Sequence, residues 1–139
     1  SDGRANLHLG GVGVGLDFAR GETAGGVVYG RLITTHPDTG RALAGTRVPA
    51  WSELLLLAAR AAEAVGLGFV GVDLVLDAGR GPLVLEVNAR PGLAIQVANR
   101  CGLRPRLAAV AAAGIPDSAA GRVALGQRLA ASLEAGAGS

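Results

Sequence analysis

Two short apolar runs near the middle of the chain carry the side chains best suited to chemistry. The first run, residues 69–76, contains Asp73, and the second, residues 83–88, contains Glu86 and Asn88. Each run is aliphatic, rich in valine and short enough for a buried strand. The segment between them is rich in glycine, so we expect the two runs to pair as an antiparallel hairpin.

Symmetric closure of this hairpin would place the two acids opposite each other. In that register Leu76 faces Leu83 beside the turn, and Asp73 faces Glu86. Because side chains alternate along a strand, Asp73, Glu86 and Asn88 then share one face, together with Val75. The other face would carry the remaining aliphatic side chains, Leu74, Leu76, Leu83, Leu85 and Val87.

The placement of two carboxylates opposite each other requires a physical explanation. Like charges directly opposite each other, with Cβ atoms roughly 5 Å apart, destabilise a sheet. Either one carboxyl group takes up a proton or a cation lies between the two. Asn88 adds an amide oxygen, and hard cations such as Mg²⁺ choose such an all-oxygen set. We therefore predict a metal site at Asp73, Glu86 and Asn88; the alternative is that the acids are solvated residues on the outer face of a half-exposed hairpin.

The composition limits the classes of protein that the chain can represent. At 139 residues it is one domain, and because 50% of it is apolar but only 3% aromatic, the core should be aliphatic with small residues. All 13 basic residues are arginines, scattered without a run, so nucleic acid is not an expected partner. Cys101 is alone, and no stretch is long enough to span a bilayer. We therefore expect a cytoplasmic protein without a membrane partner.

The order of the expected elements predicts an α+β fold, a mostly antiparallel sheet with helices on one side. Strands are expected near residues 10–18 and from 27 to 35, and turns at 21–26 and 36–40. Helices are expected from the N-cap Ser52 to Gly66, and near residues 93–100, 104–113 and 118–133.

Three alternating glycines in the first expected strand, Gly11, Gly13 and Gly15, fall on one face. Their missing side chains allow the close approach either of a ligand or of other backbone, as in a strand packed tightly under a helix, and the sequence leaves both explanations open.

Near the N-terminus, Arg4, Asn6 and His8 share a face if their segment is extended. An arginine can bind phosphate through two hydrogen bonds, and an asparagine can hold a phosphate oxygen or a metal. On spacing alone, a solvated polar strand end is the simpler explanation.

Several of these motifs together resemble the C-terminal part of an ATP-grasp domain, in its α-L-glutamate ligase-like branch. The resemblance covers nearly the whole chain and rests on Asp2-x-Arg4-x-Asn6-Leu7-His8-x-Gly10-Gly11, Gly71-Val72-Asp73, Gly81-Pro82-Leu83 and Glu86-Val87-Asn88-Ala89-Arg90-Pro91-Gly92. It implies that Asp73, Glu86 and Asn88 bind the Mg²⁺ (or Mn²⁺) ions that grip ATP. It also implies that Arg4 and Asn6 meet the transferred phosphate, with Arg4 as the catalytic residue.

The resemblance further implies an ATP-dependent ligase that joins a carboxylate to an amine through an acyl phosphate, with small molecules or peptides as substrates. The lysines with which the family grips ATP precede this segment, and the chain contains no lysine. Residues 1–135 are therefore expected to form the C-terminal lobe, followed by a flexible tail at 136–139. The N-terminal lobe would be its missing partner, and the chain alone would be inactive.

With one lobe absent, we expect the face that bears the glycines and the acids to be an open polar cleft. Two alternatives remain, a non-catalytic homologue that binds nucleotide and Mg²⁺ or assembles with a partner and, less favoured, a two-metal phosphoesterase.

Overall fold

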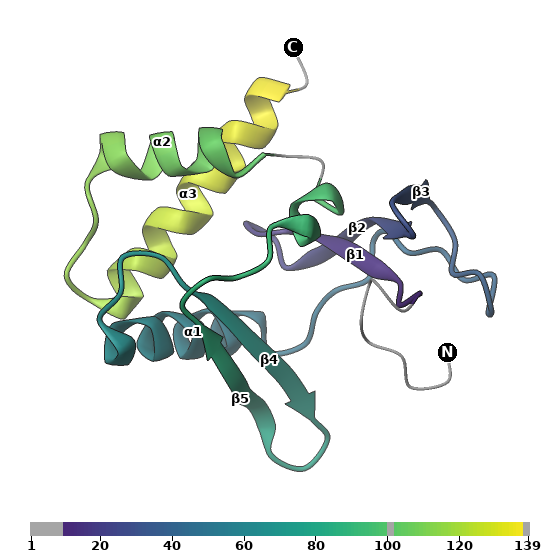
Figure 1. Ribbon diagram of the computed structural model, residues 1–139, viewed down its shortest axis with the longest axis horizontal. Helices are drawn as coiled ribbons and strands as arrows, with labels where there is room; N and C mark the ends of the chain where they lie inside the picture. The colour runs from purple at the N-terminus through teal and green to yellow at the C-terminus, as the bar shows by residue number, and fades with distance from the viewer. Residues whose placement is uncertain (1–9, 100–101, 138–139) are drawn as a thin grey trace.

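The computed structural model describes residues 10–99 and 102–137 of the chain. Its fold is α+β, as the sequence predicts, and its strands are antiparallel (Figure 1). The elements are β1 (Gly13–Asp17), β2 (Glu22–Val28), β3 (Arg31–Ile33), α1 (Trp51–Val65), β4 (Gly71–Asp77), β5 (Gly81–Asn88), the 3₁₀ helix η2 (Ala94–Val97), α2 (Leu103–Ala113) and α3 (Ala119–Ala137). Two sheets form in place of the expected one, β1-β2-β3 and the hairpin β4-β5.

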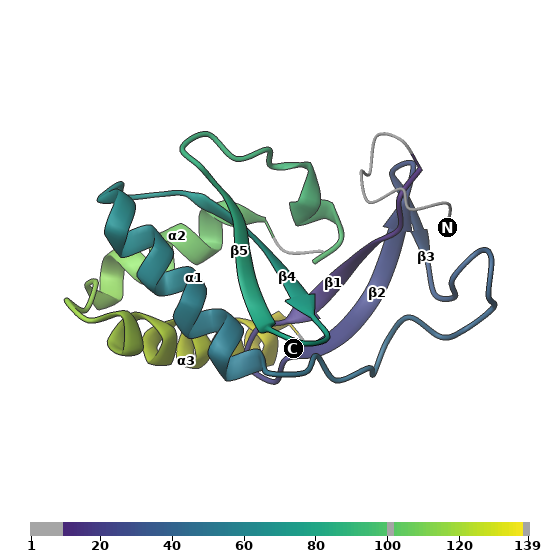
Figure 2. The ribbon, with the colours of Figure 1, turned by 90° about the horizontal axis from the view of Figure 1, so that it is seen from below.

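The three α-helices gather on one side of the molecule. Helix α1 packs against both strands of the β4–β5 hairpin and against α3, and α2 packs on α3. The hairpin lies beside α1 (Figure 2), and α3 reaches the β1–β2 turn, where Gly126 lies against the ring of Phe18. No helix in the described ranges is long and apolar enough to cross a bilayer.

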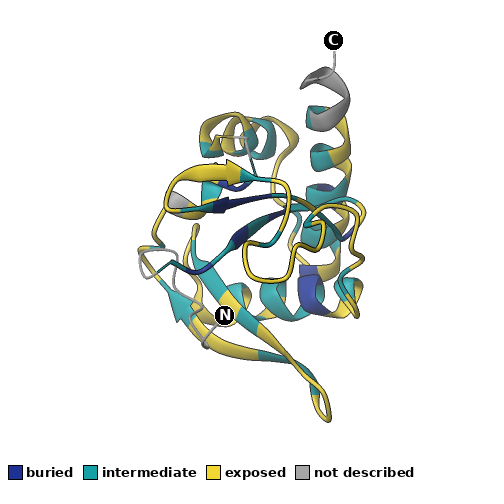
Figure 3. Ribbon diagram, turned by 90° about the vertical axis from the view of Figure 1, so that its right-hand side faces the viewer, coloured by how far each residue is buried: buried dark blue, intermediate teal, exposed yellow. Residues whose placement is uncertain are grey.

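The core is small and aliphatic, as the composition predicts. Its buried apolar side chains come from β2, α1, α3 and the end of η2: Val27, Leu54, Leu55, Ala98, Ala119 and Leu125 (Figure 3). No aromatic ring is among these buried side chains. Phe18 and Trp51 instead pack edge to face, with ring centroids 5.9 Å apart, where the β1–β2 turn meets the start of α1.

The N-terminal strands differ from the expectation in their turns. Residues 22–26, expected as part of a turn, belong to β2. The single strand expected from residue 27 to 35 is instead a hairpin, because Tyr29 and Gly30 have φ values of 47° and 73° and reverse the chain between Val28 and Arg31. Positive φ at both central residues is the signature of a type I′ turn, for which the sequence offers only one glycine. The turn at residues 36–40 is confirmed, since the Gly40 N–H donates to the His36 carbonyl at 2.9 Å.

Helix α1 begins one residue before the predicted N-cap. Ala50 occupies the N-cap position with φ 52° and offers no capping side chain, while Ser52 lies inside the first turn, so the predicted role of Ser52 is wrong. The predicted end at Gly66 is confirmed. Gly66 adopts φ 69°, and its N–H donates to the carbonyl oxygens of Ala62 and Glu63, which closes the helix.

The three alternating glycines at and just before β1, Gly11, Gly13 and Gly15, are buried. A Cβ atom on Gly15 would clash with the carbonyl oxygen of Ala98. Beside this contact the Leu16 N–H donates to Oδ1 of Asn99 at 2.9 Å. For Gly15, close packing against the residue that follows a helical segment is therefore confirmed, and the expected open glycine face is wrong, since all three glycines are buried.

This packing predicts that Gly15→Ala destabilises the chain. The added methyl group must displace the backbone at Ala98, and overpacking of this kind costs about 1–3 kcal/mol. Urea unfolding followed by circular dichroism measures the loss.

Gly68→Ala is the matched control, because a Cβ atom there meets nothing within 4 Å. A Gly15→Ala variant as stable as Gly68→Ala would show that the close approach of β1 and residue 98 does not exist.

Candidate functional site

The pairing of β4 with β5 brings the two predicted acids together. Asp73 pairs directly with Glu86, as the sequence predicts. Gly71 pairs with Asn88, so Asn88 lies on the same face as the acids at the open end of the hairpin. All three residues of the predicted metal site therefore occupy neighbouring positions on one face of the hairpin.

The register changes between the acids and the turn. Leu74 pairs with Val84 and Leu76 with Pro82, so Leu85 has no partner and forms a bulge. The predicted symmetric pairing of Leu76 with Leu83 is therefore wrong, and so is the predicted place of Leu83 on the face away from the acids. Leu83 instead pairs with Val75, on the acids' side, and Leu85 is 66% exposed.

The turn explains this bulge. Asp77 pairs with Gly81, and the Asp77 side-chain oxygen Oδ1 accepts the N–H groups of Gly79 at 2.9 Å and Arg80 at 2.8 Å. The loop thus has an odd number of residues, which places every later pair one position out of the symmetric register. One extra residue in β5 corrects the offset before Glu86 is reached.

Neither acid is neutralised by a neighbour. Asp73 and Glu86 are both exposed, and neither has a hydrogen-bond or ion-pair partner among the described residues. Ion pairs between two described residues lie elsewhere, at Arg20–Asp17, Arg47–Glu22 and Arg122–Glu63. The repulsion across the hairpin is therefore uncompensated within this part of the chain.

The available oxygen atoms fit a hard cation with an incomplete protein shell. Two carboxylates and one amide are the ligand types that Mg²⁺ accepts, and the solvent exposure of the acids leaves room for water or phosphate oxygens. No three His, Cys, Asp or Glu side chains converge in residues 10–99 or 102–137. An ion held here would depend on ligands beyond the protein.

Backbone packing fixes the open end of the hairpin. Pro91 folds back over β4, where a Cβ atom on Gly71 would lie 2.6 Å from the Cβ atom of Pro91. The same hypothetical atom would lie 3.7 Å from the Cβ atom of Asn88. The missing side chain of Gly71 thus lets Pro91, in the chain that follows β5, pack against the start of β4. Arg4, Asn6 and His8 lie outside the described residues, and their contribution stays a prediction.

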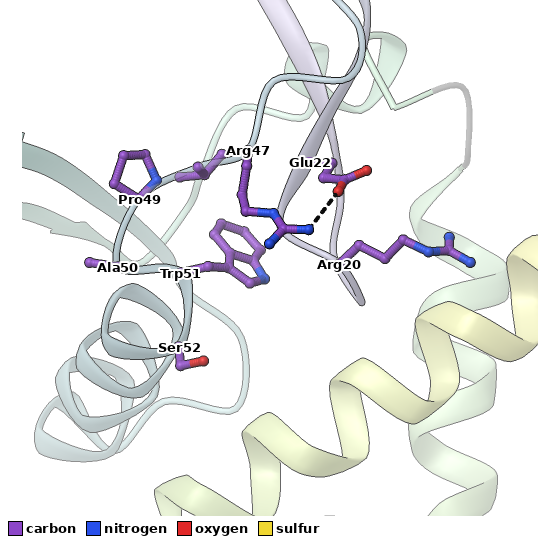
Figure 4. Close-up of a pocket in the computed structure, with 8 residues that line it drawn as sticks. Arg20, Glu22, Arg47, Pro49, Ala50, Trp51 and Ser52 are labelled. Carbon is purple, nitrogen blue, oxygen red and sulfur yellow. Dashed lines mark hydrogen bonds and ion pairs between the residues drawn. The ribbon is translucent and has the colours of Figure 1, made fainter.

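A cavity of about 490 Å³, which the sequence did not predict, opens beside the start of α1 (Figure 4). Its lining includes Trp51 from α1, Arg47 from the preceding loop, Arg20 from the β1–β2 turn and Glu22 from the start of β2. The only sequence signal was the chain's single tryptophan, placed directly before a helix.

An acid–arginine contact orders the turn beside this cavity. Burial alone would raise the pKa of Asp17, but hydrogen bonds from the side chain and backbone of Arg20, together with its charge, outweigh burial and lower the pKa below its ordinary value. The Arg20 Nη1–Asp17 Oδ2 distance is 2.7 Å. The carboxylate of Asp17 thus holds the Arg20 side chain against the β1–β2 turn.

Comparison with known proteins matches residues 1–112 to the family described as sugar-transfer associated ATP-grasp. A protein of Stenotrophomonas maltophilia strain K279a, named as a probable alpha-L-glutamate ligase, is 36% identical over 92 residues, which are 66% of this chain and 20% of that protein. A ribosomal protein bS6–L-glutamate ligase of Salmonella newport strain SL254 is 60% identical over 37 residues, which are 27% of this chain and 12% of that protein. The chain thus matches no more than a fifth of the length of these relatives. No solved structure gives a significant match.

The unpaired acids predict that Glu86→Gln stabilises the metal-free chain. Removing one of two like charges that face each other across the strands should raise the free energy of unfolding by about 0.2–1 kcal/mol. Urea unfolding in a buffer containing a chelator measures the gain, which should shrink in concentrated salt.

Glu53→Gln is the control, since Glu53 is exposed in the first turn of α1, where a negative charge is favourable. Equal losses of stability in the two variants would contradict the facing arrangement of Asp73 and Glu86.

Proposed function

Because this chain belongs to the sugar-transfer associated ATP-grasp family, a family of ATP-dependent ligases, we propose that it forms the metal- and phosphate-binding part of a carboxylate–amine ligase. The observation that carries the proposal is the facing pair Asp73 and Glu86, which is exposed and lacks a neutralising partner among the described residues. Because two facing carboxylates destabilise a hairpin, their presence here is better explained by cation binding than by a contribution to the stability of the fold.

In this proposal the carboxylates of Asp73 and Glu86 and the amide oxygen of Asn88 hold Mg²⁺ (or Mn²⁺) beside the phosphates of ATP. The bound ion would neutralise negative charge on the phosphoryl group during transfer. The hairpin supplies a fixed platform, because α1 packs against both of its strands. Arg4 would stabilise the transferred phosphoryl group and Asn6 would bind a phosphate oxygen, in the segment before β1.

The reaction would proceed in two steps. A substrate carboxylate attacks the γ-phosphorus of ATP, which releases ADP and forms an acyl phosphate. An amine then attacks the acyl carbon, forms the amide bond and releases phosphate. Arg4 would assist the first step and would prolong the lifetime of the acyl phosphate.

Glutamate as one substrate is the most specific part of the proposal. Its support is the names of the two relatives, a probable alpha-L-glutamate ligase and a ribosomal protein bS6–L-glutamate ligase. The chain spans about a fifth of the length of the first of them, so the substrates and the assignment of residues 1–135 to one lobe are proposed rather than shown. A non-catalytic homologue would more readily have lost one of the two acids.

Titration calorimetry with Mg²⁺ and Mn²⁺ tests the metal site directly. The chain should bind either ion weakly, and Glu86→Gln should weaken binding at least tenfold, because one of two carboxylate ligands is lost. Glu53→Gln should bind as the unchanged chain does. Equal binding by all three proteins would place the ion elsewhere and remove the basis of the proposed function.

In the protein that contains this chain, Glu86→Gln should lower ATP-dependent amide formation on the order of 10²-fold or more, the usual cost of removing one electrostatic stabiliser. Arg4→Ala should lower phosphoryl transfer more than ATP binding. Turnover is measured as ADP release coupled to amide formation, with Glu53→Gln as the control. Undiminished turnover in Glu86→Gln would contradict its assigned role.

A further inference from the structure

The cavity beside the start of α1 is lined by both apolar and polar side chains, and we infer that it binds a saccharide. We call its apolar residues Trp51 and Pro49 the floor, and its polar residues Arg47, Glu22 and Ser52 the rim (Figure 4). Its volume of about 490 Å³ falls in the range of small-molecule sites.

Trp51 is held in place without the help of a ligand. Its indole Nε1–H donates to the Phe18 carbonyl at 3.1 Å, and the Phe18 ring meets it at an interplanar angle of 80°. Gly21, with φ 70°, lies so close to the indole that any Cβ atom there would clash with the ring. The ring is therefore fixed, and since its one polar group is already bonded it offers the cavity apolar surface alone.

The rim keeps hydrogen-bonding capacity of both kinds. The Arg47 side chain is 82% exposed, and its Nη2 atom lies 3.4 Å from Oε1 of Glu22, at the long limit of a hydrogen bond. The remaining guanidinium donors and the second carboxylate oxygen of Glu22 are left for a ligand, and the exposed Ser52 also lines the cavity. Donors and acceptors are thus adjacent above an aromatic floor.

This combination matches the chemistry of a sugar ring. A pyranose has a flat face of C–H groups that packs on an aromatic ring, and neighbouring hydroxyl groups that each donate and accept hydrogen bonds. A guanidinium next to a carboxylate can bond two adjacent hydroxyls. A simple anion is less well served, because each arginine at the cavity already faces an acid, Arg47 with Glu22 and Arg20 with Asp17. A wholly apolar ligand would leave the rim groups desolvated and unpaired.

The inference does not depend on the proposed ligase function. The residues that line the cavity do not include Asp73, Glu86 or Asn88. Binding here can therefore be measured without metal or ATP, and its failure leaves the metal proposal untouched.

Trp51 is the only tryptophan of the chain, so its fluorescence reports on this cavity alone. The probes are methyl β-D-glucopyranoside, cellobiose and glucuronic acid, with the acyclic polyol mannitol and inorganic phosphate as comparisons. We expect a saturable change in Trp51 emission with at least one of the cyclic sugars at millimolar concentrations. Mannitol and phosphate should give none, because neither has a flat C–H face to lie on the indole.

Arg47→Met keeps an unbranched, flexible stem but removes the fork of donors, and should weaken sugar binding at least tenfold. Arg31→Met, at an exposed arginine on β3, is the matched control and should bind as the unchanged chain does. Circular dichroism and the emission maximum without sugar verify that both variants are folded. The inference is overturned by the absence of a saturable change with all three sugars, by an equal response to mannitol or phosphate, or by equal binding in the two variants.

Discussion

Like charges that face each other across antiparallel strands repel, and the pairing of β4 with β5 puts the carboxylates of Asp73 and Glu86 in this relation. Everything proposed about the metal depends on that register. The odd-numbered turn after Asp77 would by itself offset the strands by one residue, and a shift of one residue reverses the face on which a side chain lies. The bulge at Leu85 removes the offset, so the acids meet although the pairs nearer the turn are displaced.

The segment that follows β5 connects this hairpin with the rest of the chain. Pro91 covers Gly71 at the open end of the hairpin, and a few residues later Ala98 and Asn99 lie against Gly15 and Leu16 of β1. Both contacts use a glycine where a side chain would prevent the approach of backbone. Because α1 packs against both strands of the hairpin, the backbone that carries the two acids is held in place although their side chains are exposed.

The sequence predicted what local patterns determine and missed what distant segments determine together. The α+β class and the end of α1 at Gly66 follow from hydrophobic period and glycine placement. The facing of Asp73 and Glu86 was predicted correctly but from a symmetric register, and the structure reaches it only through the bulge at Leu85. The reversal at Tyr29 was missed because a bulky residue rarely takes positive φ, and the bulge at Leu85 because nothing in the run 83–88 marks an extra residue. The cavity at Trp51 was missed because its lining comes from the β1–β2 turn, a loop and a helix. For Arg4 and Asn6, only the resemblance to a family distinguished a phosphate site from a solvated strand end.

The central claim, that the facing acids of the hairpin hold a divalent cation, is tested most directly by nuclear magnetic resonance of the ¹⁵N-labelled chain titrated with Mn²⁺. The paramagnetic ion broadens the signals of amides near it, so substoichiometric Mn²⁺ should broaden the amides of Asp73, Glu86 and Asn88 first, and excess Mg²⁺ should restore them. Broadening that begins instead at acids elsewhere, such as Asp38 or Glu53, with the hairpin amides unaffected, would contradict the account.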